Sequence, residues 1–107
     1  MSNFQASLHT LVRQTNDLTT IVSELNHQIK FSGNGEIFIT FFVAIYSKSE
    51  KTLRYVNCGH NPPLLQMNGS EDVELTKGTT VLGMFEPLPF KEMGLIEKLD
   101  SFYLFVD

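Results

Sequence analysis

The chain has 107 residues, of which 42% are apolar, with 8 Lys and Arg against 12 Asp and Glu. This length suits one compact domain rather than two, and nine Phe with three Tyr make intrinsic disorder a poor interpretation. A formal net charge of -4 without a cluster of basic residues argues against nucleic acid as a partner.

Targeting signals are not evident in this sequence. The longest apolar run, Ile37 to Tyr46, has about half the length that a membrane-spanning helix needs. The amino end has neither a basic start nor a continuous apolar stretch, so a secretory signal is not expected. The single Cys58 excludes an internal disulfide and suits a reducing compartment. We therefore predict a cytoplasmic protein with no membrane contact in this segment.

Apolar residues recur twice at helical spacing in the first third of the chain, which predicts two amphipathic helices over about residues 3–31. The first contains Phe4, Leu8, Leu11, Val12 and Thr15, and the second contains Leu18, Ile21, Val22, Leu25 and Ile29. Asn16 or Asp17 is expected to cap the second helix, and Gly33 to end it in the left-handed conformation.

From Glu36 onward, β-branched and aromatic residues predict strands over about residues 36–107. The run Ile37–Tyr46 is apolar on both faces, so it needs a helix layer on one side and a second apolar layer on the other. Further strands are expected at Thr52–Cys58, Leu64–Met67, Val73–Leu75, Phe90–Lys98 and Phe102–Val106, with turns at 47–51 and Asn68–Gly69 and irregular chain over Lys77–Pro89. The predicted fold class is α+β, with two N-terminal helices packed on antiparallel sheet.

The last predicted strand, Phe102–Val106, is apolar on both faces, which predicts a core strand. The sequence nevertheless stops one residue later, at Asp107. Natural domains seldom end inside a core strand. We therefore expect residues 1–107 to be a single, truncated domain. Strands left partly uncovered tend to pair with another chain, so we also predict a homo-oligomer.

A few residues are candidates for metal binding or catalysis. Asp107, at the carboxyl end of an apolar strand, could bind magnesium or manganese, or it could be a charged terminus. Cys58 and His60 would lie on the same side of a strand, which invites a thiol–imidazole nucleophile or a metal pair. No third residue orients them, so a buried thiol and a loop imidazole are the favoured interpretation. Asp100 is favoured as a turn residue.

The remaining candidates are given structural interpretations. The segment Gly59–Pro63 is favoured as a shaped turn over direct substrate contact, because nothing near it would activate a nucleophile. His9 and His27 lie on the predicted helices without an acidic partner, so we expect them to be solvent or packing residues.

Four segments resemble, in order and spacing, the sporulation-protein-E-type serine phosphatases, the RsbU-like branch of the metal-dependent phosphatases. They are Ile37–Tyr46 (IFITFFVAIY), Leu53–Leu65 (LRYVNCGHNPPLL), Val81–Met84 (VLGM) and Asp100–Asp107 (DSFYLFVD). The stretch Asn57–Pro63 (NCGHNPP) is the most specific part. The two predicted helices match the pair that precedes the first of these strands in that family, so the resemblance covers nearly the whole chain.

The resemblance implies an α-β-β-α sandwich with a binuclear manganese or magnesium centre between its sheets. In such a centre the metals activate a water that attacks phosphoserine or phosphothreonine directly. Asp107 falls on the aspartate of the family's Thr-Asp-Gly motif, which implies a metal ligand, although Val106 stands where Thr is usual. Leu99 also stands where the family usually has Gly, and Cys58 where it often has Ala.

The family's other metal motifs fall outside this sequence. Its Gly-Gly-Asp and Asp-Val-Ser-Gly-His-Gly segments would precede Met1, and a later aspartate would follow Asp107. One carboxylate cannot build a binuclear site, because each hard cation prefers about six oxygen ligands. We expect the central part of a phosphatase whose parent acts on a phosphoprotein such as an anti-sigma-factor antagonist, with this chain alone metal-free and inactive. The alternative is a non-catalytic interaction or dimerisation module on the same scaffold.

Overall fold

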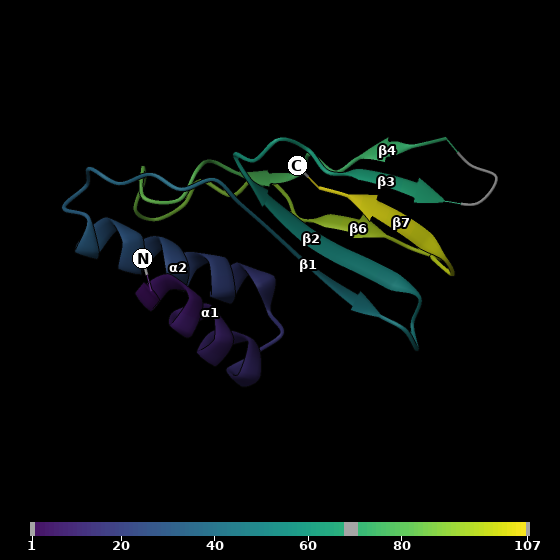
Figure 1. Ribbon diagram of the computed structural model, residues 1–107, viewed down its shortest axis with the longest axis horizontal. Coiled ribbons are helices and arrows are strands. Elements are labelled where there is room, and N and C mark those ends of the chain that lie inside the picture. The colour runs from purple at the N-terminus through teal and green to yellow at the C-terminus, as the bar shows by residue number, and fades with distance from the viewer. Residues whose placement is uncertain (1, 68–70, 107) are drawn as a thin grey trace.

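The computed structural model describes residues 2–67 and 71–106, with two helices followed by strands in two sheets (Figure 1). The elements are α1 (Ser2–Gln14), α2 (Leu18–Ser32), β1 (Phe41–Ser47), β2 (Thr52–Cys58), β3 (Leu64–Met67), β4 (Val73–Glu74), β5 (Gly78–Thr79), β6 (Gly94–Ile96) and β7 (Phe102–Phe105). The predicted α+β class is confirmed. In the described ranges, no helix is long and apolar enough to cross a membrane.

The first sheet is built on the hairpin of β1 and β2. These strands pair antiparallel from Phe41 opposite Cys58 to Ser47 opposite Thr52, as the predicted turn at 47–51 requires. The other edge of β2 carries β5 in parallel and β6 antiparallel. The pairing of β5 corrects the prediction of irregular chain over Lys77–Pro89. Such close pairing depends on Gly78, because a Cβ there would lie 2.0 Å from the carbonyl oxygen of Asn57.

The second sheet has the order β4-β3-β7, and all its pairs are antiparallel. Strand β7 runs from Phe102 opposite Met67 to Phe105 opposite Leu64. The strands expected from the sequence around these positions are therefore confirmed. The turn predicted at Asn68–Gly69 lies outside the described residues.

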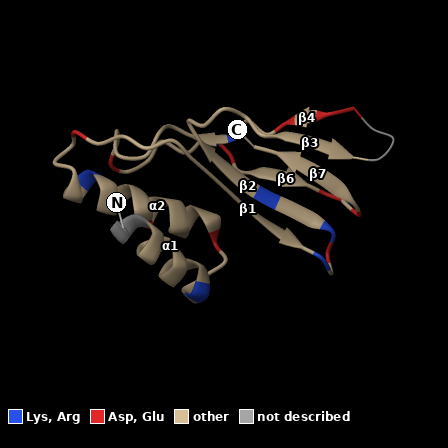
Figure 2. Cartoon of the chain, viewed as in Figure 1, with Lys and Arg blue, Asp and Glu red and all other residues tan. Residues whose placement is uncertain are grey.

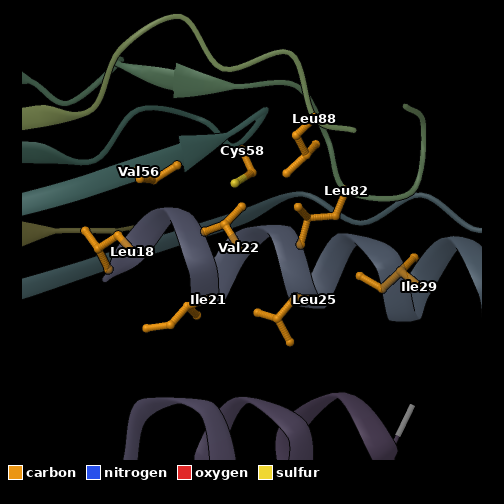
Figure 3. Close-up of a cluster of buried hydrophobic side chains, with 9 residues drawn as sticks. All are labelled: Leu18, Ile21, Val22, Leu25, Ile29, Val56, Cys58, Leu82 and Leu88. Carbon is orange, nitrogen blue, oxygen red and sulfur yellow. The ribbon is translucent and has the colours of Figure 1, made fainter. Parts of the chain in front are cut away.

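A helix layer covers one face of the first sheet. Alternate residues of β1 and β2 pack in a buried cluster there, and Figure 3 shows the side chains of Val56 and Cys58 of β2 beside those of α2. The buried cluster contains Leu18, Ile21, Val22, Leu25, Ile29, Val56, Cys58, Leu82 and Leu88. This core accounts for the helical period of the sequence, because the apolar stripe of α2 faces the sheet.

The second sheet covers the opposite face of the first. The cluster between them contains Leu53, Tyr55, Leu65, Leu75 and Leu99, with Phe42, Ala44, Tyr46 and other partly buried residues packed against it. The hydroxyl of Tyr46 donates to the Leu99 carbonyl, and its ring meets Phe102 edge-on at a centroid distance of 5.0 Å. The two-sided cover predicted for Ile37–Tyr46 is thus confirmed, and the layers run helices, sheet, sheet.

The outer face of the second sheet differs from the prediction for Phe102–Val106. Phe102 and Leu104 point into the core, whereas Tyr103 is 71% and Phe105 54% exposed. The prediction of a core strand therefore holds for one face only. The physical reason is that no layer packs on the outer side of this sheet within the part of the chain that the structure describes.

The two ends of α2 can be compared with the capping residues predicted from the sequence. Asp17 is the N-cap, and its carboxylate accepts from the Thr19 N–H at 3.3 Å. Gly33 follows the helix with φ -93°, so the left-handed stop predicted there is wrong. The positive φ comes one residue later, at Asn34 with φ 53°. Glycine at 33 instead permits close packing, since a Cβ would lie 2.8 Å from the Ile37 Cβ.

Candidate functional site

Cys58, His60 and the turn Gly59–Pro63 lie where the chain passes from the first sheet to the second. Strand β2 ends at Cys58, and β3 begins at Leu64 in the other sheet. Strand β7 finishes beside this crossing, because Phe105 lies opposite Leu64. The ends of both sheets therefore meet at the turn Gly59–Pro63, which brings together segments far apart in the sequence.

Asn57 holds this turn in shape. The residue is 4% exposed, and its side chain accepts from the His60 N–H at 2.8 Å and donates to the Leu75 carbonyl at 3.0 Å. The amide thereby ties the turn to the segment after β4. Sequence reasoning used Asn57 only as part of a motif. The signal for its role was a polar amide inside an apolar strand, where burial requires hydrogen-bond partners.

The predicted shaped turn is confirmed at its first residue. Gly59 has φ 70°, a left-handed conformation that favours glycine. The space at this position is also closed, because a Cβ would lie 2.5 Å from the Val81 Cγ1. The turn ends at Pro63, which is buried and fixes the entry into β3.

Cys58 faces the helix layer and has no exposed surface. Burial raises the pKa of its thiol from 9.0 to about 12, so the thiol stays neutral near pH 7. His60 follows the left-handed turn at Gly59, so the alternation of a strand does not carry it to the side of Cys58. Its Nδ1 lies 2.8 Å from the Asn61 carbonyl instead. The favoured interpretation of a buried thiol and a loop imidazole is confirmed.

The predicted metal ligand, Asp107, lies outside the described residues, so its role stays a prediction. Within residues 2–67 and 71–106, no three or more His, Cys, Asp or Glu side chains come together as a metal site would require. The described residues by themselves therefore do not fit a binuclear centre.

Asp100 holds the segment before β7 in place through an ion pair with Lys51. Its carboxylate lies 2.6 Å from the Lys51 ammonium, and the Leu99 N–H donates to the Lys51 carbonyl at 2.8 Å. The hydrogen bond with Asp100, and then its charge, raise the pKa of Lys51. Asp100 is thus a structural residue of the kind that was predicted, with a cross-sheet partner that the sequence alone did not indicate.

A second polar cluster joins α2 to the loop after Leu82. His27 Nδ1 lies 3.2 Å from the Glu86 carboxylate, so the prediction that His27 lacks an acidic partner is wrong. Asn26 is buried and uses both ends of its amide on the same loop, bonding the Gly83 N–H and the Phe85 carbonyl. These partners are brought together only by tertiary folding, which is why helical spacing missed them. The available signal was an amide in register with the apolar stripe of α2.

Comparison with known proteins identifies the family to which the chain belongs. A scan against protein-family models matches Stage II sporulation protein E (SpoIIE) over residues 1–105. The chain belongs to the SpoIIE family. This is a family of PPM-type, metal-dependent phosphatases, so the resemblance drawn from the sequence is confirmed. The SpoIIE match includes both helices, both sheets and the Gly59–Pro63 turn. A search of the curated proteins found no match, and neither did a search of the solved structures.

Proposed function

We propose that this chain forms the central part of a metal-dependent serine/threonine protein phosphatase domain. The observation that carries the proposal is the SpoIIE match over residues 1–105, which includes every helix and strand of the described layers. The parent domain hydrolyses phosphoserine or phosphothreonine on a cytoplasmic regulatory protein, such as an anti-sigma-factor antagonist.

The contribution of this segment to such a domain is a rigid frame at the end of the sandwich. The turn Gly59–Pro63 is held by the Asn57 amide, and β7 ends beside it at Phe105. Asp107 follows two residues after Phe105, and we propose it as a ligand for manganese or magnesium in the complete domain. The other ligands come from segments that this sequence does not contain.

We further propose that the isolated chain is inactive. The support is its donor set, because no three or more of the described His, Cys, Asp and Glu side chains come together. The same observation favours a second candidate, a non-catalytic interaction or dimerisation module on the SpoIIE scaffold. In that case the partner segments would lack metal-binding aspartates, and the scaffold would serve only for binding.

The two candidates are separated by a chimera. Residues 1–107 replace the matching segment of an active SpoIIE-family phosphatase, and phosphoserine-peptide hydrolysis is measured with manganese. The phosphatase proposal expects turnover that is lost in Asp107→Asn and kept in the control Glu97→Gln, which changes an exposed carboxylate. A folded chimera without turnover would support the non-catalytic module.

The inactivity of the isolated chain is tested by itself. Calorimetric titration of the chain and of Asp107→Asn with manganese is run beside the same hydrolysis assay. We expect neither turnover nor a difference in manganese binding between the two proteins. Turnover that disappears in Asp107→Asn would show that the metal site is completed by residues of this chain.

A further inference from the structure

We infer that a pocket beside the Gly59–Pro63 turn binds an acidic residue of the phosphoprotein substrate, close to its phosphoserine. The pocket has a volume of about 370 Å³ and lies between β5 and the segment before β6. It is lined by residues 76–80 on one side and by Pro89, Lys91 and Glu92 on the other. Contacts within this chain therefore define its shape. The inference rests on the proposed function, because it names what the phosphatase would recognise in its substrate.

Backbone and side-chain contacts hold the two walls of the pocket together. The Lys91 N–H donates to the Gly78 carbonyl at 3.4 Å, and the Thr79 hydroxyl donates to the Pro89 carbonyl at 3.2 Å. The first wall is also fixed to the sheet, since β5 pairs in parallel with the last two residues of β2. A pocket built on paired backbone is formed before its ligand arrives, which lowers the entropic cost of binding.

The charged side chains of the pocket favour an anion. Two lysines and one glutamate line it, so its charge is opposite in sign to the net charge of -4 on the whole chain. The Lys77 ammonium lies 3.7 Å from the Glu92 carboxylate, and both side chains are more than half exposed. Such a pair is weak, so a second carboxylate can compete for Lys77. Within the described ranges Lys91 makes no ion pair, so its charge is available to a ligand.

The pocket lies at the same end of the sandwich as the candidate site. Val81 directly follows the first wall and packs on the turn, because a Cβ at Gly59 would lie 2.5 Å from the Val81 Cγ1. Strand β7 finishes beside the same turn. Extended chain spans about 3.3 Å per residue. A peptide with its phosphoserine at this end can therefore place a nearby acidic residue in the pocket.

Basic residues elsewhere on the fold are spread out. Figure 2 shows them singly on the helices and on β2 and again at the β1–β2 hairpin, while acidic residues gather at β4. The hairpin is at the far end of β2 from the pocket, because β5 pairs with the last two residues of that strand. The two lysines of the pocket are therefore placed to attract an acidic segment to the turn end of the sandwich.

Binding is tested first on the chain itself. NMR titrations use three separate probes: a phosphate-free peptide rich in glutamate, the same peptide with glutamine in place of glutamate, and inorganic phosphate. We expect saturable shifts at the amides of Gly78, Thr79 and Lys91 with the glutamate peptide alone, and binding about tenfold weaker in Lys91→Gln. Absence of these shifts overturns the inference. Equal shifts with inorganic phosphate at the same concentration would show an adventitious ion only and also overturn it.

Two substitutions of opposite effect separate recognition from stability. Glu92→Gln removes the carboxylate that competes for Lys77, so it should strengthen binding of the glutamate peptide about threefold, whereas Lys77→Gln should weaken it. The backbone bond that joins the walls is kept in both variants. Lys48→Gln, at the far end of the β1–β2 hairpin, is the matched control and should leave binding unchanged. Weaker binding in Glu92→Gln would overturn the inference.

The chimera that tests the proposed function also tests the role of the pocket in hydrolysis. Phosphoserine peptides flanked by glutamate or by glutamine are compared with manganese present. The glutamate peptide should have a KM about tenfold lower, and this preference should be lost in Lys91→Gln and kept in Lys48→Gln. Equal KM values for the two peptides in an active chimera overturn the inference, whereas a lack of turnover with either peptide contradicts the proposed function itself.

Discussion

The Gly83 N–H donates to Oδ1 of Asn26 at 2.7 Å, a bond between positions 57 residues apart. The other end of the same amide donates to the Phe85 carbonyl at 2.7 Å, and the Asn26 residue is only 1% exposed. One side chain of α2 thus satisfies two backbone groups of a distant loop. The path of the chain after Leu82 depends on this amide, because irregular backbone has few internal hydrogen bonds of its own.

Replacing this amide by an apolar group of similar size should be costly. Asn26→Leu leaves the Gly83 N–H and the Phe85 carbonyl without their partner, and we expect the free energy of unfolding to fall by about 2–4 kcal/mol. Urea denaturation measures this change. His27→Ala, which removes the exposed contact of the next helix residue with Glu86, is the control and should cost less than about 1 kcal/mol. Equal losses in the two variants would mean that the amide is not needed to hold the loop.

Alanine substitutions at Gly59 and Gly35 should distinguish the cost of a left-handed backbone from the cost of a steric clash. Gly59 and Gly35 have φ 70° and 74°, but a Cβ at Gly59 would meet Val81 at 2.5 Å, while nothing lies within 4 Å at Gly35. Gly35→Ala should therefore cost about 1 kcal/mol from the left-handed backbone alone. Gly59→Ala should cost about 1–3 kcal/mol more, because it adds a clash. Thermal and urea unfolding of both variants measure the difference, and equal costs would contradict the crowding at Val81.

The buried thiol of Cys58 should make the free energy of unfolding decrease as the pH becomes alkaline. The pKa of Cys58 in the folded protein, about 12, lies above its ordinary value of 9.0, so the folded state holds this proton more tightly than the unfolded state. The resulting stabilisation is complete below pH 9 and is lost as pH rises toward 12. We expect its contribution to fall by about 1.4 kcal/mol between pH 8 and pH 10.

Cys58→Ala is the matched comparison for this dependence. Lysine and tyrosine residues titrate in both proteins, so their effects cancel in the difference between the two urea unfolding curves. The advantage of the natural protein over the variant should shrink from pH 8 to pH 10. A constant difference would mean that the thiol is accessible to water in the folded state.

The two faces of the second sheet should respond differently to substitution. Leu65 has no exposed surface, and Leu65→Ala should cost about 2–4 kcal/mol through lost burial and a cavity. Tyr103 is 71% exposed, and Tyr103→Thr should change the free energy of unfolding by less than about 0.5 kcal/mol. Denaturation of the two variants tests the layer order directly. A large loss in Tyr103→Thr would show that something covers the outer face in solution.

Short-range patterns in the sequence predicted the elements well. The helical period located both helices, and Asp17 was correctly proposed as an N-cap because capping involves only neighbouring residues. The apolar alternation of Ile37–Tyr46 required cover on two sides, and both layers are present. Helix α2 does end at Gly33 as predicted, but the left-handed conformation expected there was wrong, since close packing against Ile37 accounts for the glycine instead.

The candidate site depended more on the tertiary structure. The sequence by itself determined the α+β class, the SpoIIE resemblance and the importance of Asn57–Pro63, because periodicity and motif spacing are local properties. Only the folded chain decided that β7 ends beside that turn and that Tyr103 faces solvent. The folded chain also decided that Asn26 and His27 hold a loop more than fifty residues away. Those relationships rest on which sheet each strand joins, and strand pairing is set by contacts between segments distant in the sequence, which local patterns do not encode.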